Sequence, residues 1–431
     1  MMGFFWCGLP KLAGEHVRLP ASEDGTGAFP AAKLMSLVGG MVAGADSIDD
    51  MDRLRHGAMG RLFSGVRAPS TQGSFLRSFT HGHVKQLHAV ARRFLHELAR
   101  HTPLLPGADQ AAYVDIDDTI RRTHGYAKQG AGYGYSKVKG LNALLGVVST
   151  PLSAPVIAAT RLRKGPSNSA RGAAEFVAET IRTARACGAN GLLVLRADSA
   201  FYVINACRAV GARFSVTTRM NASVKATIAR IDEDAWTPIK YPQAVWDEEG
   251  QCWISDAEIA EIRYTAFTSR PKKQQVTARL IARRVKRLSA GTVPAGQGTL
   301  FDTWRHHAAF TDSPLALRDA ERDHRRHAVV EQVIADVKNS GFAHAPSGHF
   351  QANAAWLALA ALTHDLTRTA GALASAFHAR ATTATIRDRL INVPARLARS
   401  ARRLTLHLPE RWPWSEDFTQ LFSTVHAPPA L

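Results

Sequence analysis

The sequence predicts an α/β fold, because strand patterns and helix patterns alternate through the middle of the chain. Residues 111–117, AAYVDID, alternate between polar and apolar residues as a strand with one buried face does. Residues 192–201, LLVLRADSAF, form a nearly continuous apolar run that ends at an acid, which is typical of a buried parallel strand. Between them, residues 167–191 combine polar cap residues, an apolar stripe and a glycine stop, which predicts a helix.

Composition and charge limit the possible functions. The chain has 431 residues, of which 45% are hydrophobic, so it can bury a large core divided among two or three domains. Lys and Arg number 54 against 36 Asp and Glu, a net charge of +18 that favours a polyanionic partner such as nucleic acid or an anionic membrane surface. Because no apolar run approaches the ~20 residues of a spanning helix, and the first residues do not resemble a secretion signal, we do not expect membrane insertion or export. Its four cysteines lie far apart, which fits a reducing cytoplasm and no zinc-cysteine motif.

The remaining elements follow the same patterns in chain order. Several short helices are expected between residues 30 and 100, and they either present one helix to a groove of DNA or only pack together. The expected sheet then continues as strands over 140–149 and 153–165, the strand at 192–201, a helix over 202–211 and a strand over 213–218.

A second region of strands is expected over residues 219–312. Alternation on both sides of the turn DEEGQ, residues 247–251, predicts a hairpin, and two further strands follow it. Asp312 and Ser313 are expected to cap the next helix. Four tryptophans lie here, and each either packs between strands or stacks on a base turned out of a duplex, a choice that the sequence leaves open: Trp236, Trp246, Trp253 and Trp304.

Acidic residues gather where the first strand ends. Asp115, Asp117 and Asp118 lie within four positions, and such closely spaced carboxylates are unfavourable unless a cation neutralises them. Side chains alternate along a strand, so Asp115 and Asp117 share one face and Asp118 takes the other. Asp198 also ends a predicted strand. A lone Asp in this position usually caps or turns the chain, but two on adjacent strands predict a site for Mg²⁺.

A further carboxylate is expected from a helix over residues 324–338. At about 100° per residue, His324, His327, Glu331 and Lys338 fall within a roughly 60° arc, while apolar residues cover the sides that pack on a core. This polar face is either a solvated surface or part of a site. A structural zinc held by His324, His327 and Glu331 is an alternative, because their spacing allows one metal to be bound.

These acids, taken in order, resemble those of a known family. Asp117 in DIDDT, Asp198 in RADSAF and Glu331 in HAVVEQVIADVK look like the three catalytic acids of bacterial insertion-sequence DDE transposases with an RNase H-like fold. The branch that the chain resembles carries a β-rich insertion before the Glu and a Tyr-x₂-Arg-x₃-Glu-x₆-Lys signature around it. Lys338 matches the signature lysine, whereas His occupies both position 324, where the signature has Tyr, and position 327, where it has Arg.

The resemblance implies a fold and a division of the chain. The expected fold is an RNase H-like mixed sheet flanked by helices, with a β-rich insertion and an N-terminal helical domain. Residues 1–108 are expected to form an N-terminal helical, DNA-end-binding region. The catalytic core is expected in two parts, residues 109–218 and residues 313–380 with the Glu helix, separated by the β-rich insertion over residues 219–312. Residues 381–431 are expected to form a basic C-terminal tail.

The resemblance also implies a function. The implied function is that of a transposase, which would bind the terminal inverted repeats of its own element as duplex DNA, cleave them and join them to target DNA, acting as a homodimer in the bacterial cytoplasm and nucleoid. Two ions of Mg²⁺ or Mn²⁺ would be held by Asp117, Asp198 and Glu331, and phosphate by His324, His327 and Lys338. Histidine in place of arginine implies a weaker, pH-dependent grip on phosphate. The alternative is a catalytically inactive DNA-binding protein derived from such a transposase.

Overall fold

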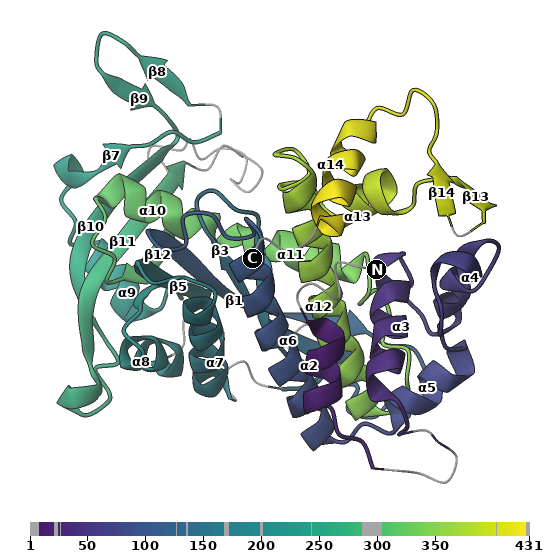
Figure 1. Cartoon of the computed structure of the whole chain (residues 1–431). Helices are drawn as coiled ribbons and strands as arrows, with labels where there is room; N and C mark the ends of the chain where they lie inside the picture. Colours follow the sequence, from purple (N-terminus) through teal and green to yellow (C-terminus); the bar gives the residue numbers. More distant parts are fainter. Residues whose placement is uncertain are drawn as a thin grey trace, which may run out of the picture. The chain divides into compact units, whose positions relative to one another are not determined.

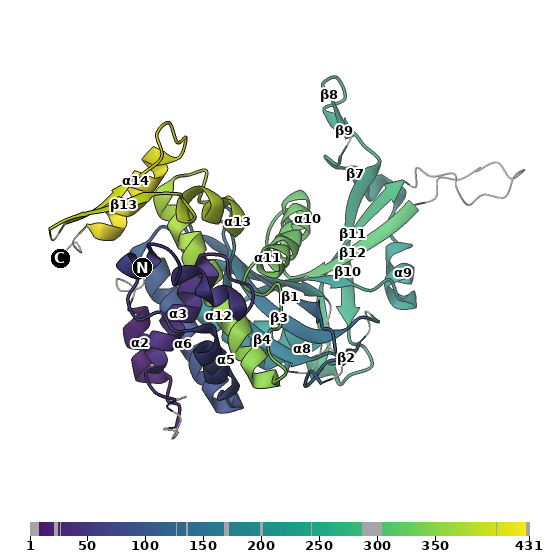
Figure 2. The ribbon, with the colours of Figure 1, turned by 90° about the vertical axis from the view of Figure 1, so that its right-hand side faces the viewer.

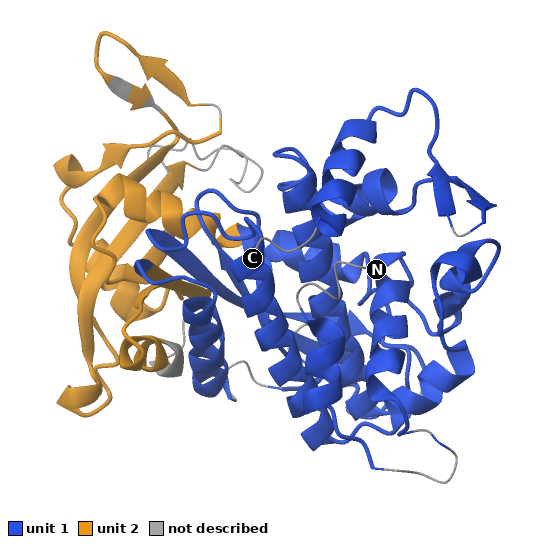
Figure 3. Cartoon of the chain, in the orientation of Figure 1, with its two compact units in different colours: residues 1–192, 329–431 blue, residues 193–328 orange. Residues whose placement is uncertain are grey.

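The chain forms two compact units in a computed structural model (Figure 3). Unit 1 comprises residues 1–192 and 329–431, and unit 2 comprises residues 193–328. The structure describes the following residues: 8–20, 25, 27–125, 127–134, 137–167, 172–198, 201–242, 244–286, 304–401 and 403–427.

Unit 1 begins with helices that pack around one long helix from the far end of the sequence (Figures 1 and 2). The N-terminal helical elements are α2 (Leu9–His16), α3 (Pro30–Val42), the 3₁₀-helix η1 (Asp49–Leu54), α4 (Met59–Leu62), α5 (Pro69–Arg77) and α6 (His81–His101). Helix α6 begins with a capping box, in which the side chains of Thr80 and His83 each accept a hydrogen bond from the backbone N–H of the other residue. Its buried residues, which include Val84, Leu87 and Phe94, lie on the side that packs against α2 and α12 (Phe350–Ala374).

The strands of unit 1 are antiparallel. Those of its sheet are β1 (Ala111–Arg122), β2 (Gly132–Tyr133), β3 (Lys139–Ser149) and β4 (Val156–Lys164), and β3 pairs with each of the other three. Helix α7 (Ala173–Ala186) packs closely on one face of them: a Cβ added to Gly146 of β3 would lie 2.5 Å from Oγ1 of Thr180. A side chain at position 146 would therefore displace the helix.

The described C-terminal residues of unit 1 form helices and a hairpin. Their elements are α11 (Val329–Lys338), α12, α13 (Thr383–Ile386), the π-helix η5 (Arg387–Ile391), β13 (Arg396–Ser400), β14 (Arg403–His407) and α14 (Ser415–His426). Trp414, Phe418 and Leu421 pack against Ile386 and Leu390. Residues 381–427, which we expected to be a basic tail, thus form helices and the β13–β14 hairpin, because this apolar cluster anchors them; the arginines of the hairpin remain exposed.

Unit 2 contains one parallel pair of strands followed by an antiparallel sheet. Strand β5 (Leu192–Asp198) pairs parallel with β6 (Arg213–Thr218), and β6 pairs antiparallel with β12 (Trp304–Thr311). The sheet continues in the order β12-β11-β10-β7, and β8 and β9 form a separate hairpin. The other elements are α8 (Phe201–Ala209), α9 (Ala222–Ile228), η2 (Glu233–Ala235), β7 (Thr237–Pro238), β8 (Val245–Asp247), β9 (Cys252–Ile254), β10 (Ala257–Ala266), η3 (Lys272–Gln274), β11 (Val276–Lys286), α10 (Leu317–Arg325) and η4 (Arg326–Ala328).

The α/β class and the strands expected over 219–312 are therefore found, whereas the helix expected over residues 324–338 is wrong. The chain instead forms the end of α10, the 3₁₀ turn η4 and α11, so positions 324 and 327 do not belong to the helix that carries Glu331 and Lys338. The expected caps are also wrong: α10 begins after Ala316, and Asp312 accepts the backbone N–H of Phe214 at 2.7 Å instead. None of the helices in the described ranges has the length and apolar character needed to cross a membrane.

Candidate active site

The two faces of β1 carry different chemistry. Ile116 pairs with Gly146, so the even-numbered residues of β1 face α7. Lys338 of α11 donates from Nζ to Oγ1 of Thr119 at 3.0 Å, which places α11 at the opposite, odd-numbered face. Asp117 is half-buried on this odd face, two residues or ~7 Å along the strand from Thr119. Asp115, on the same face, is fully buried.

Asp118 is committed to the α7 face by an ion pair with Arg163 of β4. The guanidinium of Arg163 also donates from Nε to Oδ1 of Asn142 on β3 at 2.8 Å, and its side chain is only 7% exposed. Burial lowers the pKa of Arg163, and the carboxylate of Asp118 opposes that shift. Asp118 therefore has a structural partner, which the sequence pattern did not reveal.

We expect Arg163→Ala to lower the free energy of unfolding by about 2 kcal/mol, because the amide oxygen of Asn142 and the carboxylate of Asp118 lose their shared donor. Arg161→Ala is the matched control on the same strand and face: its side chain is 28% exposed and pairs with Glu175 and Glu179, so we expect a loss of about 1 kcal/mol or less. Urea unfolding of the three proteins measures both values. Equal losses would show that the Arg163 pair contributes no more than a surface ion pair.

Contacts on two of its sides hold helix α11 in place. Val330, Val333 and Val337 are buried, and the helix packs against β1 and β3. On a second side of the helix, about 90° around the axis from the valines, Asp336 accepts hydrogen bonds from both the backbone N–H (3.0 Å) and Oγ1 (2.6 Å) of Thr383. His364 of α12 lies with its Nε2 3.6 Å from Asp336. These contacts fix which side of α11 faces Thr119 of β1. Strand β1 continues to Arg122, so the expectation that the strand ends at Asp117 is wrong, and Asp117 lies within it.

The side of α11 that faces Thr119 carries Glu331 and Lys338. They are seven residues apart within α11, so they share a face and are separated by about 10 Å along the helix axis. Glu331 lies in the first turn and is exposed. Lys338 is partly buried, and this burial, together with the nearby Arg121, lowers its pKa. The structure thus brings together Asp117, Thr119 and Lys338 on the odd face of β1, with Glu331 two turns away along α11.

The other predicted residues lie in unit 2. Asp198 is the last residue of β5, directly after the buried Ala197, and its side chain lies outside the described residues. The ring of His324 contacts Oγ of Ser215 through Nδ1 at 3.0 Å and Oγ1 of Thr217 through Nε2 at 3.5 Å. His327 lies in η4 and is partly buried.

The donor set fits a hard divalent cation. Asp117 and Glu331 supply carboxylate oxygens, the ligands that Mg²⁺ and Mn²⁺ prefer. Over the ranges given above, which omit the side chain of Asp198, no group of three His, Cys, Asp or Glu side chains is arranged to hold a metal. The zinc alternative built on His324, His327 and Glu331 accordingly gains no support.

The four tryptophans divide into two pairs. Trp236 and Trp304 both contact Arg284, whose guanidinium carbon is 4.3 and 4.4 Å from their ring centroids. Trp246 and Trp253 pack edge to face across the β8–β9 hairpin, with centroids 5.1 Å apart. Trp246 is 38% exposed and Trp236 is buried, so among these four Trp246 is the ring most accessible to a base.

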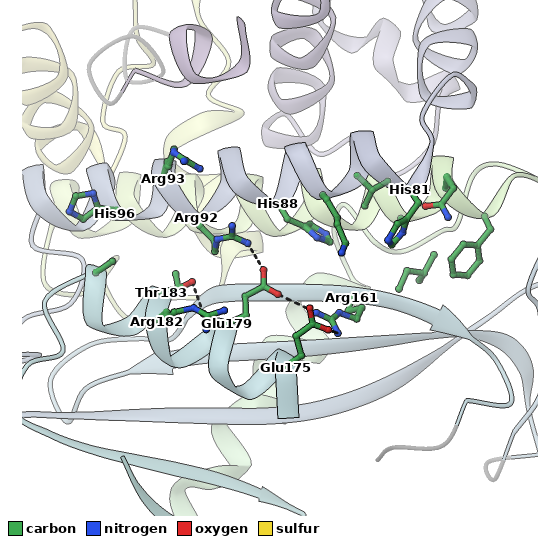
Figure 4. Close-up of a pocket in the computed structure, with 17 residues that line it drawn as sticks. His81, His88, Arg92, Arg93, His96, Arg161, Glu175, Glu179, Arg182 and Thr183 are labelled. Carbon is green, nitrogen blue, oxygen red and sulfur yellow. Dashed lines mark hydrogen bonds and ion pairs between the residues drawn. The ribbon is translucent and has the colours of Figure 1, made fainter. Parts of the chain in front are cut away.

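A basic groove lies on the other side of the unit 1 strands, and the sequence analysis missed it. Its volume is about 620 Å³, and α6, α7, β4 and the start of α12 line it (Figure 4). Glu179 of α7 pairs with Arg92 of α6 and, at 3.2 Å, with Arg161 of β4. The signal was present in the sequence as a spacing of four, three, four and four residues between basic side chains of α6: His81, Lys85, His88, Arg92 and His96.

The sequence also matches a family of known proteins. The match is to the transposase DDE domain group 1 family and extends over residues 29–429, nearly the whole chain. The chain therefore belongs to this family of DDE transposases. Its mixed α/β architecture, with strands flanked by helices, agrees with the RNase H-like fold that we expected. No curated protein is similar enough in sequence to count as a match.

Proposed function

We propose that this protein is the transposase of a bacterial insertion sequence, which binds the terminal inverted repeats of its element, cleaves them and joins them to target DNA. The observation that carries the proposal is the grouping of Asp117 with Thr119 and Lys338 on one face of β1, beside the helix that bears Glu331. Family membership and the net charge of +18 support a DNA substrate. The proposal further includes a homodimer acting on DNA in the cytoplasm and nucleoid, and the regions set out in the sequence analysis.

In this proposal Asp117, Asp198 and Glu331 hold two ions of Mg²⁺ or Mn²⁺. When bound, such ions would activate an oxygen nucleophile and neutralise charge on the leaving oxygen of an in-line displacement at phosphorus. Lys338 donates a hydrogen bond to Thr119, which lies on the same face of β1 as Asp117. Its ammonium group is therefore suited to hold a phosphate of the DNA end. His324 and His327 are proposed as further phosphate contacts, because they occupy the Tyr and Arg positions of the signature.

The proposed function is tested by Glu331→Gln, which should reduce Mg²⁺-dependent cleavage of element-end DNA by about 10²–10³-fold or more, because the amide lacks the charge needed near the reacting phosphate. Binding of the same DNA without divalent ions should change by less than about twofold. Glu416→Gln is the control, since Glu416 is also an exposed carboxylate in the first turn of a helix. Full cleavage by the Glu331→Gln protein would remove Glu331 from the site.

The second candidate is a DNA-binding protein that has lost catalysis. It is favoured by the two departures from the signature, His324 and His327, and by the contacts of His324 with Ser215 and Thr217. The same assay separates the two candidates: the unmodified protein would bind element ends but would not cleave them with either Mg²⁺ or Mn²⁺.

A further inference from the structure

The basic groove of unit 1 has the length and charge of a site for an extended polyanion. His81, Lys85, His88, Arg92 and His96 fall within a roughly 80° arc of α6 and extend over about 22 Å. Arg161 and Arg182 add cations from β4 and α7, as Figure 4 shows. With histidines neutral, the lining carries five cations, Lys85, Arg92, Arg93, Arg161 and Arg182, against the two acids Glu175 and Glu179.

The two acids neutralise only the middle of the groove. Glu179 pairs with Arg92 and Arg161, and Glu175 lies 3.5 Å from Arg161. These pairs connect α6, α7 and β4 and give the groove a fixed floor. At its rim, Lys85 and Arg182 are exposed on opposite walls, and within the described part of the chain neither forms an ion pair with a carboxylate. Their charges are therefore available to a ligand.

We propose that this groove binds the phosphate backbone of duplex DNA, independently of sequence and separately from the catalytic acids. Each strand of a duplex carries a phosphate about every 3.4 Å along its axis, so a stripe of about 22 Å faces several phosphates, whereas a single phosphate or mononucleotide would occupy only one part of it. The separation follows from the register of β1: α7 packs against the even face, and Asp117 lies on the odd face with α11. The choice of duplex DNA as the ligand rests on the proposed function, whereas the presence of a polyanion site is argued from the charge and length of the groove.

The test compares two charge-neutralising double variants of the full chain. Lys85→Gln with Arg182→Gln removes one cation from each wall, and Lys11→Gln with Arg100→Gln removes two exposed cations elsewhere in unit 1. Affinity for a random-sequence duplex is measured in EDTA over a range of salt. We expect the groove variant to bind more weakly and to lower the slope of log K against log salt by about 2, since each phosphate contact contributes about 0.9. The control should keep the slope of the unmodified protein, and equal losses in both variants would overturn the proposal.

A second measurement uses the unmodified protein and does not depend on the folding of a variant. Acetylation of exposed lysines is followed with and without duplex DNA. DNA should protect Lys85 several-fold and leave Lys11, which is 79% exposed on α2, reactive. Equal reactivity of Lys85 in both conditions would overturn the proposal, as would equal protection by inorganic phosphate, which would indicate a small-anion site. Neither measurement involves cleavage. Duplex DNA should therefore protect Lys85 in the Glu331→Gln protein as it does in the unmodified protein, even if the proposed catalytic role of Glu331 fails.

Discussion

Asp117→Asn should abolish metal-dependent strand cleavage, whereas Asp118→Asn should leave it within about threefold of the unmodified protein. The two residues are neighbours in sequence but lie on opposite faces of β1. Asp117 is on the face where Lys338 meets Thr119, and Asp118 is paired with Arg163 on the α7 face. In the proposed function the Asp117 carboxylate acts near the reacting phosphate, so we expect loss of its charge to cost about 10²–10³-fold or more in the cleavage rate.

Asp118→Asn should act on stability instead. Its amide oxygen still accepts a hydrogen bond from Arg163 but the charge is lost, so we expect the free energy of unfolding to fall by about 1 kcal/mol. The measurements are cleavage of element-end DNA with Mg²⁺ and urea unfolding of each variant. DNA binding in EDTA should be retained by both. The opposite pattern, with cleavage lost in Asp118→Asn and kept in Asp117→Asn, would place the first catalytic acid on the α7 face.

The sequence could predict which residues share a face of β1, but not which partners contact each face. Alternation alone separates Asp115 and Asp117 from Asp118, because it is a local property of a strand. It does not reveal that Arg163, 45 residues later, reaches Asp118, since that pairing depends on the antiparallel register of β1, β3 and β4. The choice of Asp117 rests on the family resemblance and stays a prediction; the register adds that Asp117 shares a face of β1 with Thr119, which Lys338 contacts.

The helix expected over residues 324–338 failed for a different reason. A periodic pattern continues through residues 326–328 as if the chain were helical, but the turn there is 3₁₀ and a separate α-helix, α11, begins at Val329. A 3.6-residue period cannot show such a break, because each piece satisfies it separately. Glu331 and Lys338 keep their relation because both belong to α11, whereas the angular positions assigned to His324 and His327 do not carry over.

The basic groove was missed because its walls come from distant parts of the sequence. The stripe on α6 is regular enough to be found by a helical count, but a stripe of charge on one helix is most often a solvated surface. Only the packing of α7 and β4 beside it, with Glu179 joining Arg92 and Arg161, turns the stripe into one wall of a groove.

His88, within this groove, should make the protein less stable as the pH falls from about 6.5 to 4. Burial lowers the pKa of His88 from its ordinary 6.5 to about 4. Arg92 and His81 on α6 and Arg161 on β4 lower it, and Glu179 on α7 opposes them. Over this interval the unfolded chain therefore binds a proton at His88 that the folded chain does not, so stability declines with acidification, by at most about 3 kcal/mol.

The His88→Gln protein should lose less stability over the same interval, because glutamine does not titrate. Urea unfolding at pH 7, 6, 5 and 4.5 gives the difference between the two proteins, which isolates His88 from carboxylates that titrate in both. His81→Gln is the control: His81 is exposed at the start of the same helix, so its replacement should leave the acid-side decline in place. Parallel pH profiles for the unmodified and His88→Gln proteins would show that His88 is protonated as readily in the folded chain as in the unfolded one, and that the groove does not exclude a proton from it.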